Sequence, residues 1–477
     1  MTRTGRGGMF AATGSGTMPH RTGDCMRNLP AHTDTDKLPD VAELCAQAAQ
    51  AVERARKAGA TAAEASLGVG TALTVNVRKG EIESVEFQRD RDLGITVYFG
   101  QRRGHASTSD LSDKAVGEAI EHACAIARFT GEDPYAGLAD AERMAVTFPE
   151  LDLDHPWPLD VDKAVALARE AETTALQFDK RISNSEGAGV DTRRGISVYA
   201  NSHGFVGHQQ GTRHSLSCAV IGGTGEGMQR DYWYSAARHA DALEPAAQIG
   251  RRAAERTVSR LHPRGLDTRR APVLFVPELA RGLFGSFIGA ISGSALYRKA
   301  SFLLDHQGKQ VFSPEVNIGQ RPHLPRAMGS TAYDQEGVAT TDRDLVVGGV
   351  LQGYVLGSYS ARRLGLQSTG NSGGVFNLVV QPGPRGFDEL LREMGSGLVV
   401  TELMGQGVNT VTGDYSRGAA GFWVENGAIA YPVAGITIAG NLREMFKGIR
   451  AIGNDVDTRG NIRAGSVLIE SMTIAGQ

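Results

Sequence analysis

Apolar and polar residues alternate with a period of two from Leu73 to Thr108, in the run LTVNVRKGEIESVEFQRDRDLGITVYFGQRRGHAST. Successive side chains of a β-strand point to opposite faces of its sheet, so this alternation is typical of half-buried strands. Turn residues interrupt it at Lys79-Gly80, at Arg89–Asp92 and at Gly100. The segment therefore predicts an antiparallel meander.

Helical periodicity flanks this meander, and the same order then recurs along the chain. Two short segments also match, Gly94–Tyr98 (GITVY) and Gly195–Tyr199 (GISVY), with Asp90 and Asp191 each four residues ahead of the glycine. A match of this length also arises by coincidence between edge hairpins, but the repeated order favours two related helix-meander-helix modules. The elements expected are helices at 38–58 and 112–129 around the first meander, then a helix at 161–178, a meander at 182–221 and a helix at 245–261.

The chain becomes rich in glycine and strand-forming residues after Gly265. A short apolar run at 271–276 precedes a helical pattern at 278–291, which Gly282, Gly285 and Gly289 interrupt. Further strand patterns lie at 345–356, 375–380, 421–432 and 466–474, with short helical patterns at 387–394 and 441–452. This half predicts a large, mainly antiparallel β domain, and the whole chain an α+β fold.

Length and composition suggest how the chain is divided. A chain of 477 residues is too long for one ordinary core. Residues 1–37 lack apolar periodicity and predict a disordered leader. We expect an N-terminal module at 38–145, a central module at 146–264 and the β-rich domain at 265–477.

Charge and apolar content exclude some classes of partner. Lys and Arg number 50 against 53 Asp and Glu, which leaves no basic footprint for nucleic acid. No apolar run approaches the roughly 20 residues that cross a bilayer, so no membrane association is expected. Four cysteines without C-x-x-C spacing fit reduced thiols and a cytoplasmic protein.

Three histidines, His203, His208 and His214, form the densest histidine cluster. On a strand, His208 and His214 would share a face but stand about 20 Å apart, far beyond a zinc–nitrogen bond of about 2.1 Å. Only a sharp hairpin would bring the three together. We therefore interpret them as solvent-facing strand histidines and keep a zinc site as the alternative.

Three further motifs have a structural and a functional interpretation. GNSGG at 370–374 resembles the nucleophile segment of chymotrypsin-type proteases, but His323 is the only histidine in the fifty residues before it, so a turn is favoured. GGTGEG at 222–227 lacks the lysine of a phosphate-binding loop and predicts a hairpin loop. Arg298-Lys299 and Arg362-Arg363 could hold a peptide carboxylate, although such pairs usually solvate a surface.

Three blocks of the C-terminal half are highly specific: VLFVPELARGLFGSFIGAISGSALYRKASFLLD, DQEGVATTDRDLVVGGVLQGYVLGSYSARRLG, and MGQGVNTVTGDYSRGAAGFWVENGAIAYPV followed by ITIAGNL. In these blocks the chain resembles the TldD/PmbA family, in its PmbA (TldE) branch. The resemblance extends from about Leu38 to the C-terminus. It implies a cytoplasmic peptidase of paired related subunits that trims leader peptides of bacteriocins and degrades small unfolded proteins.

The resemblance also implies where the chemistry resides. In the TldD branch a helix carries H-E-x-x-x-H, and its histidines hold zinc together with a cysteine near the C-terminus, while the glutamate acts as base. Here the matching positions are Pro277, Glu278 and Gly282, and the late cysteine is absent. Glu278 would be a vestigial base, no zinc is expected on this chain, and zinc is expected on a TldD-type partner.

The remaining implications concern partners and alternatives. Tyr297, Arg298 and Lys299 belong to the preserved frame and are candidate peptide-binding residues. The expected partners are a TldD-type catalytic subunit and unfolded peptides, with a homodimer also possible. Two alternatives stay open: a metallopeptidase with an atypical zinc site such as His203 and His208 plus an acid, and a non-enzymatic modulator of DNA gyrase, a name given to the family.

Overall fold

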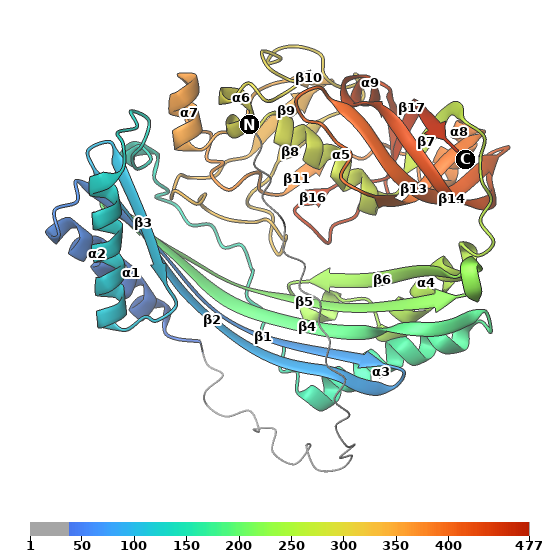
Figure 1. Cartoon of the computed structure of the whole chain (residues 1–477), viewed down its shortest axis with the longest axis horizontal. Coiled ribbons are helices and arrows are strands. Elements are labelled where there is room, and N and C mark those ends of the chain that lie inside the picture. Colours follow the sequence, from blue (N-terminus) through green and yellow to red (C-terminus); the bar gives the residue numbers. More distant parts are fainter. Residues whose placement is uncertain (1–37, 477) are drawn as a thin grey trace, which may run out of the picture. The chain divides into compact units, whose positions relative to one another are not determined.

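The computed structural model describes residues 38–476, and its N-terminal half is built on one six-stranded sheet (Figure 1). Its strands follow the order β3-β2-β1-β4-β5-β6, and every neighbouring pair is antiparallel. The strands are β1 Ala62–Arg78, β2 Glu81–Phe99, β3 Arg102–Thr108, β4 Ile182–Asn201, β5 Val206–Gly222 and β6 Gln229–Ala237.

The strand order confirms two helix-meander-helix modules, which meet where β1 pairs with β4. Each module contributes one helix before its three strands and one after them. In this arrangement β2 of the first module corresponds to β5 of the second. The matching segments Gly94–Tyr98 and Gly195–Tyr199 lie instead on β2 and β4. The match between the two segments is therefore not a remnant of the duplication. Because β2 and β4 both pair with β1, the tyrosines of the two segments lie on the two sides of β1.

All the helices of the two modules cover the same face of this sheet. They are α1 Val41–Lys57, α2 Asp113–Phe129, α3 Val161–Phe178 and α4 Ala246–Ser259. Side chains of β1 at odd positions are buried against α1 and α2 near one end and against α3 and α4 near the other. The even positions point to the opposite face, which carries the site described below.

The turn predicted at Arg89–Asp92 is wrong. β2 passes through these residues without interruption, and they pair with Gly68–Thr71 of β1. Arg89–Asp92 are exposed, so this part of the strand shows no alternation to distinguish it from a turn. The turn at Lys79-Gly80 is confirmed, since both residues have positive φ values, 54° and 76°.

The C-terminal half contains two sheets, and the prediction of mainly antiparallel strands is confirmed. The larger sheet has the order β14-β13-β12-β7-β17-β15 and the smaller one β10-β9-β8-β11-β16. Only the pairs β7–β12 and β11–β16 are parallel among the described residues. The larger sheet comprises β7 Arg269–Phe275, β12 Gly397–Met404, β13 Asp414–Glu425, β14 Ala428–Asn441, β15 Ile449–Ile452 and β17 Val467–Ala475; the smaller, β8 Ile318–Gln320, β9 Arg343–Val347, β10 Val350–Leu351, β11 Leu378–Val380 and β16 Ile462–Arg463.

Several single elements expected in this half are divided in the structure. The strand patterns at 345–356 and 421–432 each fold back as a hairpin, at Gly348-Gly349 and at Asn426-Gly427. The predicted helix at 441–452 ends early, and strand β15 follows it. The helices of this half are α5 Pro277–Ala290, α6 Gly293–Tyr297, α7 Ser358–Leu364, α8 Phe387–Met394 and α9 Leu442–Lys447. Phenylalanines of α5 (Phe284 and Phe287) pack in a fully buried core with Phe312 and Phe446.

The expected domain boundaries remain predictions. The modules 38–145 and 146–264 share one sheet through the long β1–β4 pairing, and each of the two hydrophobic clusters on it takes residues from both modules. The leader, 1–37, lies outside the described residues. Within the described part of the chain, no helix has both the length and the apolar character needed to span a membrane.

Candidate functional site

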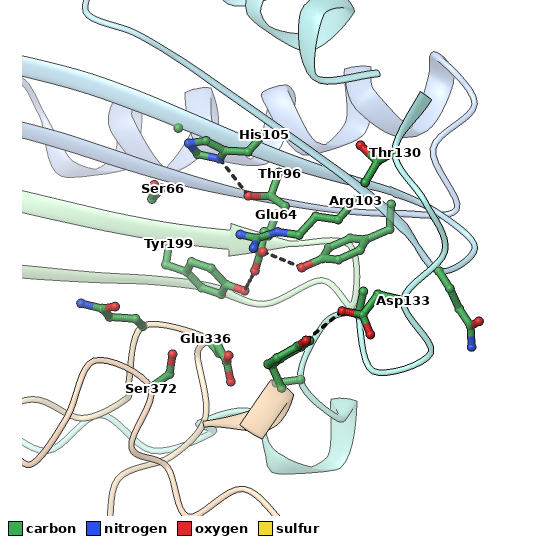
Figure 2. A pocket seen from close by; sticks show the side chains of 18 of the residues that line it. Glu64, Ser66, Thr96, Arg103, His105, Thr130, Asp133, Tyr199, Glu336 and Ser372 are labelled. Atoms are coloured by element: carbon green, nitrogen blue, oxygen red, sulfur yellow. Dashed lines mark hydrogen bonds between the residues drawn. The ribbon is translucent and has the colours of Figure 1, made fainter. Parts of the chain in front are cut away.

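A cavity of about 640 Å³ lies against the helix-free face of the N-terminal sheet, where β1, β2, β3 and β4 face loops of the C-terminal half (Figure 2). We call it the Glu64 pocket. Strand residues form its floor, residues 130–139 form one wall, and Gln335, Glu336, Tyr359 and Ser372 form another. Its floor consists of Glu64, Ser66, Gly94, Thr96, Tyr98, Arg103, His105 and Tyr199.

The strand register brings the floor residues together. Glu64 of β1 lies opposite Thr96 of β2, and Thr96 lies opposite His105 of β3. Ser66 has Gly94 on one side and Tyr199 on the other. Residues that are directly opposite across neighbouring strands share a face, so four strands point these side chains into one cavity.

Glu64 is the central polar group of this floor. One carboxylate oxygen accepts a hydrogen bond from the Tyr98 hydroxyl at 2.9 Å, and the other accepts one from the Tyr199 hydroxyl at 2.7 Å. Burial raises the pKa of Glu64, and the two tyrosine bonds and Arg103 only partly oppose this. Burial and the nearby Glu64 charge also raise the pKa values of both tyrosines, which therefore remain hydrogen-bond donors.

The second wall of the pocket is a turn held by Asp334. This buried carboxylate accepts backbone N–H bonds from Glu336 at 2.9 Å and Val338 at 3.0 Å, and from Ser372 at 2.8 Å. Burial raises the pKa of Asp334 to about 7, against the opposing effect of these three bonds. Asp334 thus fixes Glu336 and Ser372 at the edge of the pocket.

The wall formed by residues 130–139 is attached to α7. The Tyr359 hydroxyl donates to Asp133 at 2.8 Å. Arg362 donates to the carbonyl oxygens of Gly137, at 3.2 Å, and Leu138. The expectation that Arg362-Arg363 merely solvates a surface is wrong, because Arg362 holds this wall and Arg363 lies over the Tyr135 and Tyr297 rings.

The positions that match the zinc helix lie in the first turns of α5. Pro277 is its first residue, and an added side chain at Gly282 would meet open space. The Glu278 carboxylate pairs with Arg256 of α4 at 3.3 Å and with Arg459 at 3.9 Å. Arg459 also pairs with Asp457 at 2.9 Å. Glu278 therefore belongs to an ion-pair network between the central module and the C-terminal half.

Tyr297, Arg298 and Lys299 lie at the end of α6, outside the Glu64 pocket. The Tyr297 ring contacts the Tyr359 ring edge-to-face at 5.9 Å and so supports a residue of the pocket wall. Arg298 and Lys299 are exposed. Their role in peptide binding stays a prediction.

The three clustered histidines do not converge. His203 Nε2 lies 3.0 Å from the Ala139 carbonyl oxygen, whereas His214 Nε2 lies 2.9 Å from that of His155. His203 and His208 are exposed as expected, but His214 is fully buried, so the solvent-facing interpretation is wrong for it. Residues 38–476 contain no group of three or more His, Cys, Asp or Glu side chains arranged to hold a metal ion.

The glycine-rich motifs form turns and loops. Asn371 of GNSGG is buried and donates to Gln320 at 2.6 Å, and Gly370, Gly373 and Gly374 have positive φ values. His323 bonds to Thr340 rather than to Ser372, so no serine–histidine pair forms here. GGTGEG connects β5 to β6, as predicted for a hairpin loop.

Sequence reasoning missed Glu64 as a site residue. The available signal was a single acid among small and apolar residues in AAEASLGVG, on the strand between the two segments that end in Tyr98 and Tyr199. Finding the site required knowing that β2 and β4 both pair with β1. Nothing in the periodicity alone gives that pairing.

The fold and this site define a mostly antiparallel α+β protein whose N-terminal sheet and C-terminal β domain enclose a polar pocket. Three domain descriptions of one family match the chain: PmbA/TldA metallopeptidase domain 1 at residues 63–127, the central domain at 154–261 and the C-terminal domain at 268–476. The chain belongs to the PmbA/TldD metallopeptidase family. The resemblance seen in the sequence is confirmed.

Individual relatives agree with this assignment. A metalloprotease PmbA homolog of Haemophilus influenzae is 50% identical over 449 residues, which cover 94% of this chain and 99% of the relative. Metalloprotease PmbA of Escherichia coli O157:H7 is also 50% identical, over 87% of this chain and 92% of its own.

Solved structures share the fold. A Bacteroides thetaiotaomicron protein described as a modulator of DNA gyrase superposes with a TM-score of 0.86 at 28% identity, covering 91% of this chain and 98% of that one. TldE from Thermococcus kodakarensis gives 0.79 at 22% identity, over 90% and 99% of the two chains, and supports the fold alone.

Proposed function

We propose that this chain is the non-catalytic, PmbA/TldE-type subunit of a cytoplasmic peptidase complex, whose zinc site belongs to a TldD-type partner and whose substrates are unfolded or leader peptides. The observation that carries the proposal lies in the first two turns of α5. The position expected for the first zinc-binding histidine is Pro277, and that for the second is Gly282. Neither residue has a side chain that can coordinate zinc.

The environment of Glu278 supports the same proposal. A general base in a zinc peptidase must reach a metal-bound water. The Glu278 carboxylate instead faces two arginines, Arg256 and Arg459, at 3.3 and 3.9 Å. These ion pairs hold the side chain in place, which suits a structural role between α4 and α5.

The test uses the full chain alone, a TldD-type subunit alone and the two together. We expect the chain alone to hold no stoichiometric zinc by elemental analysis and to leave an unfolded peptide intact. The two chains should co-elute in size-exclusion chromatography, and only the mixture should cleave. About one zinc per chain here, removed by a chelator together with peptidase activity, would support the atypical zinc site instead.

A control separates the subunit role from simple stabilisation of the partner. An unrelated protein at the same concentration should not restore cleavage by the TldD-type subunit. If that subunit is fully active alone, the proposed role is wrong. Binding to DNA gyrase, measured under the same conditions, would favour the gyrase-modulator alternative.

A further inference from the structure

Glu64 is a carboxylate whose charge is only partly offset by Arg103. Its two oxygens accept bonds from Tyr98 and Tyr199, but within residues 38–476 it forms no ion pair. A buried carboxylate is costly unless charge and hydrogen bonds compensate it. A carboxylate has about four acceptor positions, so two tyrosine hydroxyls leave acceptor capacity that faces the cavity.

The charge around the cavity favours a cationic ligand. Two further carboxylates, Asp133 and Glu336, line the same pocket. Arg103 is the opposing cation, and its side chain is exposed and forms no ion pair with Glu64. Figure 2 shows Glu64 on the floor, with Asp133 and Glu336 on the walls.

The pocket continues into two further cavities along the sheet. The next cavity, of about 700 Å³, shares Ser66, Tyr199 and Gln335 with the Glu64 pocket. A third, of about 420 Å³, shares Ser197 and Gln209 with the second. The three cavities therefore adjoin one another along the sheet, and we call the row the sheet groove.

Several small residues lie on the floor of the sheet groove. Even positions of β1 from Ser66 to Ala72 carry only serine, glycine or alanine, and Gly195 and Ser197 of β4 lie beside them. The Asp92 side chain of β2 lies over Gly68. The strand from Glu64 to Ala72 spans about 26 Å at 3.3 Å per residue, the length of an extended segment of similar residue number. The small residues of β1 and β4 thus leave room for an extended chain beside the Asp92 side chain.

We propose that the Glu64 pocket binds the primary ammonium group of an unfolded peptide, and that the peptide continues in extended form along the sheet groove. The peptide as ligand class rests on the proposed function. The ammonium would donate to the Glu64 oxygens, while the neutral tyrosines hold the carboxylate in place. Charge-assisted hydrogen bonds of this kind are about twice as strong as neutral ones.

The test measures binding to the full chain alone, by fluorescence anisotropy, without the partner and without cleavage. The probe is an eight-residue Ala/Ser/Thr peptide labelled at its C-terminus, with either a free or an acetylated N-terminus. A third peptide is acetylated and carries one lysine in the first position. We expect acetylation to weaken binding about tenfold or more, the effect of losing one charge-assisted contact of about 1.4 kcal/mol.

The lysine peptide distinguishes the two sources of an ammonium group. Recovery of binding by the lysine would assign the pocket to any primary ammonium, whereas no recovery would assign it to the peptide N-terminus. Both results support the proposal. Equal binding of the free and acetylated peptides would overturn it, as would tighter binding of the acetylated one.

Two variants and one control locate the contact. Glu64→Gln keeps the size of the side chain and should abolish the preference for the free amine, whereas Glu86→Gln, an exposed change on the same sheet, should not.

Gly70→Val tests the sheet groove. It should weaken binding of the eight-residue peptide but not binding of a tripeptide. A Cβ at Gly70 would meet its nearest atom, the Arg194 carbonyl oxygen, at an ordinary 3.5 Å, so the backbone need not move.

The wild-type comparison of peptides decides the proposal even if Glu64→Gln fails to fold. A Glu64→Gln protein with an unchanged melting temperature and an unchanged preference for the free amine would overturn it. Because no partner is present, failure here leaves the subunit proposal standing. Conversely, a chain that binds free-amine peptides without associating with a TldD-type subunit would refute only the subunit proposal.

Discussion

At the scale of single residues, chemistry follows from neighbours more than from residue type. The position of Glu278 in α5 suggested a vestigial catalytic base. Its carboxylate instead forms ion pairs with Arg256 and Arg459. Glu64 did not stand out in the sequence, but it lies among polar side chains from four strands of the N-terminal sheet. The spacing of residues in α5 was predictable from the sequence. The partners of Glu64 were not, because they come from two other strands, β2 and β4.

The first residue-scale prediction concerns Glu278. Glu278→Gln removes one charge from a partly buried network but keeps an acceptor, so the loss in unfolding free energy should stay near 1 kcal/mol. Cleavage by the complex with a TldD-type subunit should change by less than about twofold, or 0.4 kcal/mol. Denaturant unfolding and a peptidase assay measure the two effects, with the exposed Glu425→Gln as control. A loss of orders of magnitude in rate would make Glu278 catalytic.

The second residue-scale prediction concerns the free energy of unfolding, which should depend on pH because of Asp334. Burial raises its pKa from 3.8 to about 7, so between these values the folded chain holds a proton that the unfolded chain has released. Stability should therefore fall as pH rises from about 4 to about 7 and level off above. Asp334→Asn should lack this decline, and it should also be less stable because an amide cannot accept all three N–H bonds.

Urea unfolding at several pH values from 4 to 8 measures this difference. Asp342→Asn, an exposed change in the same half of the chain, serves as the control and should follow the wild type. A parallel pH profile for Asp334→Asn and wild type would contradict the assignment.

At the scale of elements, turns with a distinctive residue pair were predictable and polar strands were not. Lys79-Gly80 reverses the chain with two positive φ values, which few residue pairs adopt readily. The exposed stretch Arg89–Asp92 looks like a turn in sequence because no face of it is apolar, and only its pairing with β1 makes it a strand. The α3 helix, by contrast, has an apolar stripe throughout and runs from Val161 to Phe178 as expected.

The β1–β2 turn of the first module depends on helix α3 of the second module. Glu172 of α3 is 1% exposed, and its two oxygens accept the backbone N–H groups of Lys79 and Gly80 at 2.7 and 2.8 Å. Glu172→Ala leaves both donors of the β1–β2 turn without a partner, which should lower the unfolding free energy by about 3 kcal/mol. Glu170→Ala, exposed on the same helix, should cost less than about 0.5 kcal/mol.

Chemical denaturation compares the two variants, and hydrogen exchange of the Lys79 and Gly80 amides shows whether the effect is local. Equal stability of Glu172→Ala and Glu170→Ala would mean that the turn does not need this contact.

At the scale of the whole molecule, long-range contacts join the two halves of the described chain. The apolar periodicity of the sequence does not predict these contacts. The Arg238 guanidinium, at the end of β6, donates to the carbonyl oxygens of Thr212, Ala327 and Met328 at 3.0 to 3.1 Å. Family resemblance and strand patterns gave the α+β class and the mainly antiparallel β domain. The cavity between the halves depends on such long-range contacts and could not be predicted.

Arg238 supplies the whole-molecule prediction. Arg238→Leu keeps part of the packing but leaves carbonyl oxygens on both halves without their donor, so we expect a loss of about 2–4 kcal/mol. Calorimetry should show a lower melting temperature, or two separate transitions if the halves uncouple. Arg213→Leu, an exposed change on β5, is the control. A single transition at the wild-type temperature would show that this contact is dispensable.

The bonds from Tyr98 and Tyr199 to one carboxylate also set an order of events during synthesis. Glu64 and Tyr98 are 34 residues apart, whereas Glu64 and Tyr199 are 135 apart. A ribosome adds about 5–20 residues per second, so β1 waits several seconds or longer for β4. Throughout that interval the β1 edge that β4 will cover stays open to other strands. The binding pocket therefore matures late, and a chaperone that shields β1 during this interval would favour correct folding.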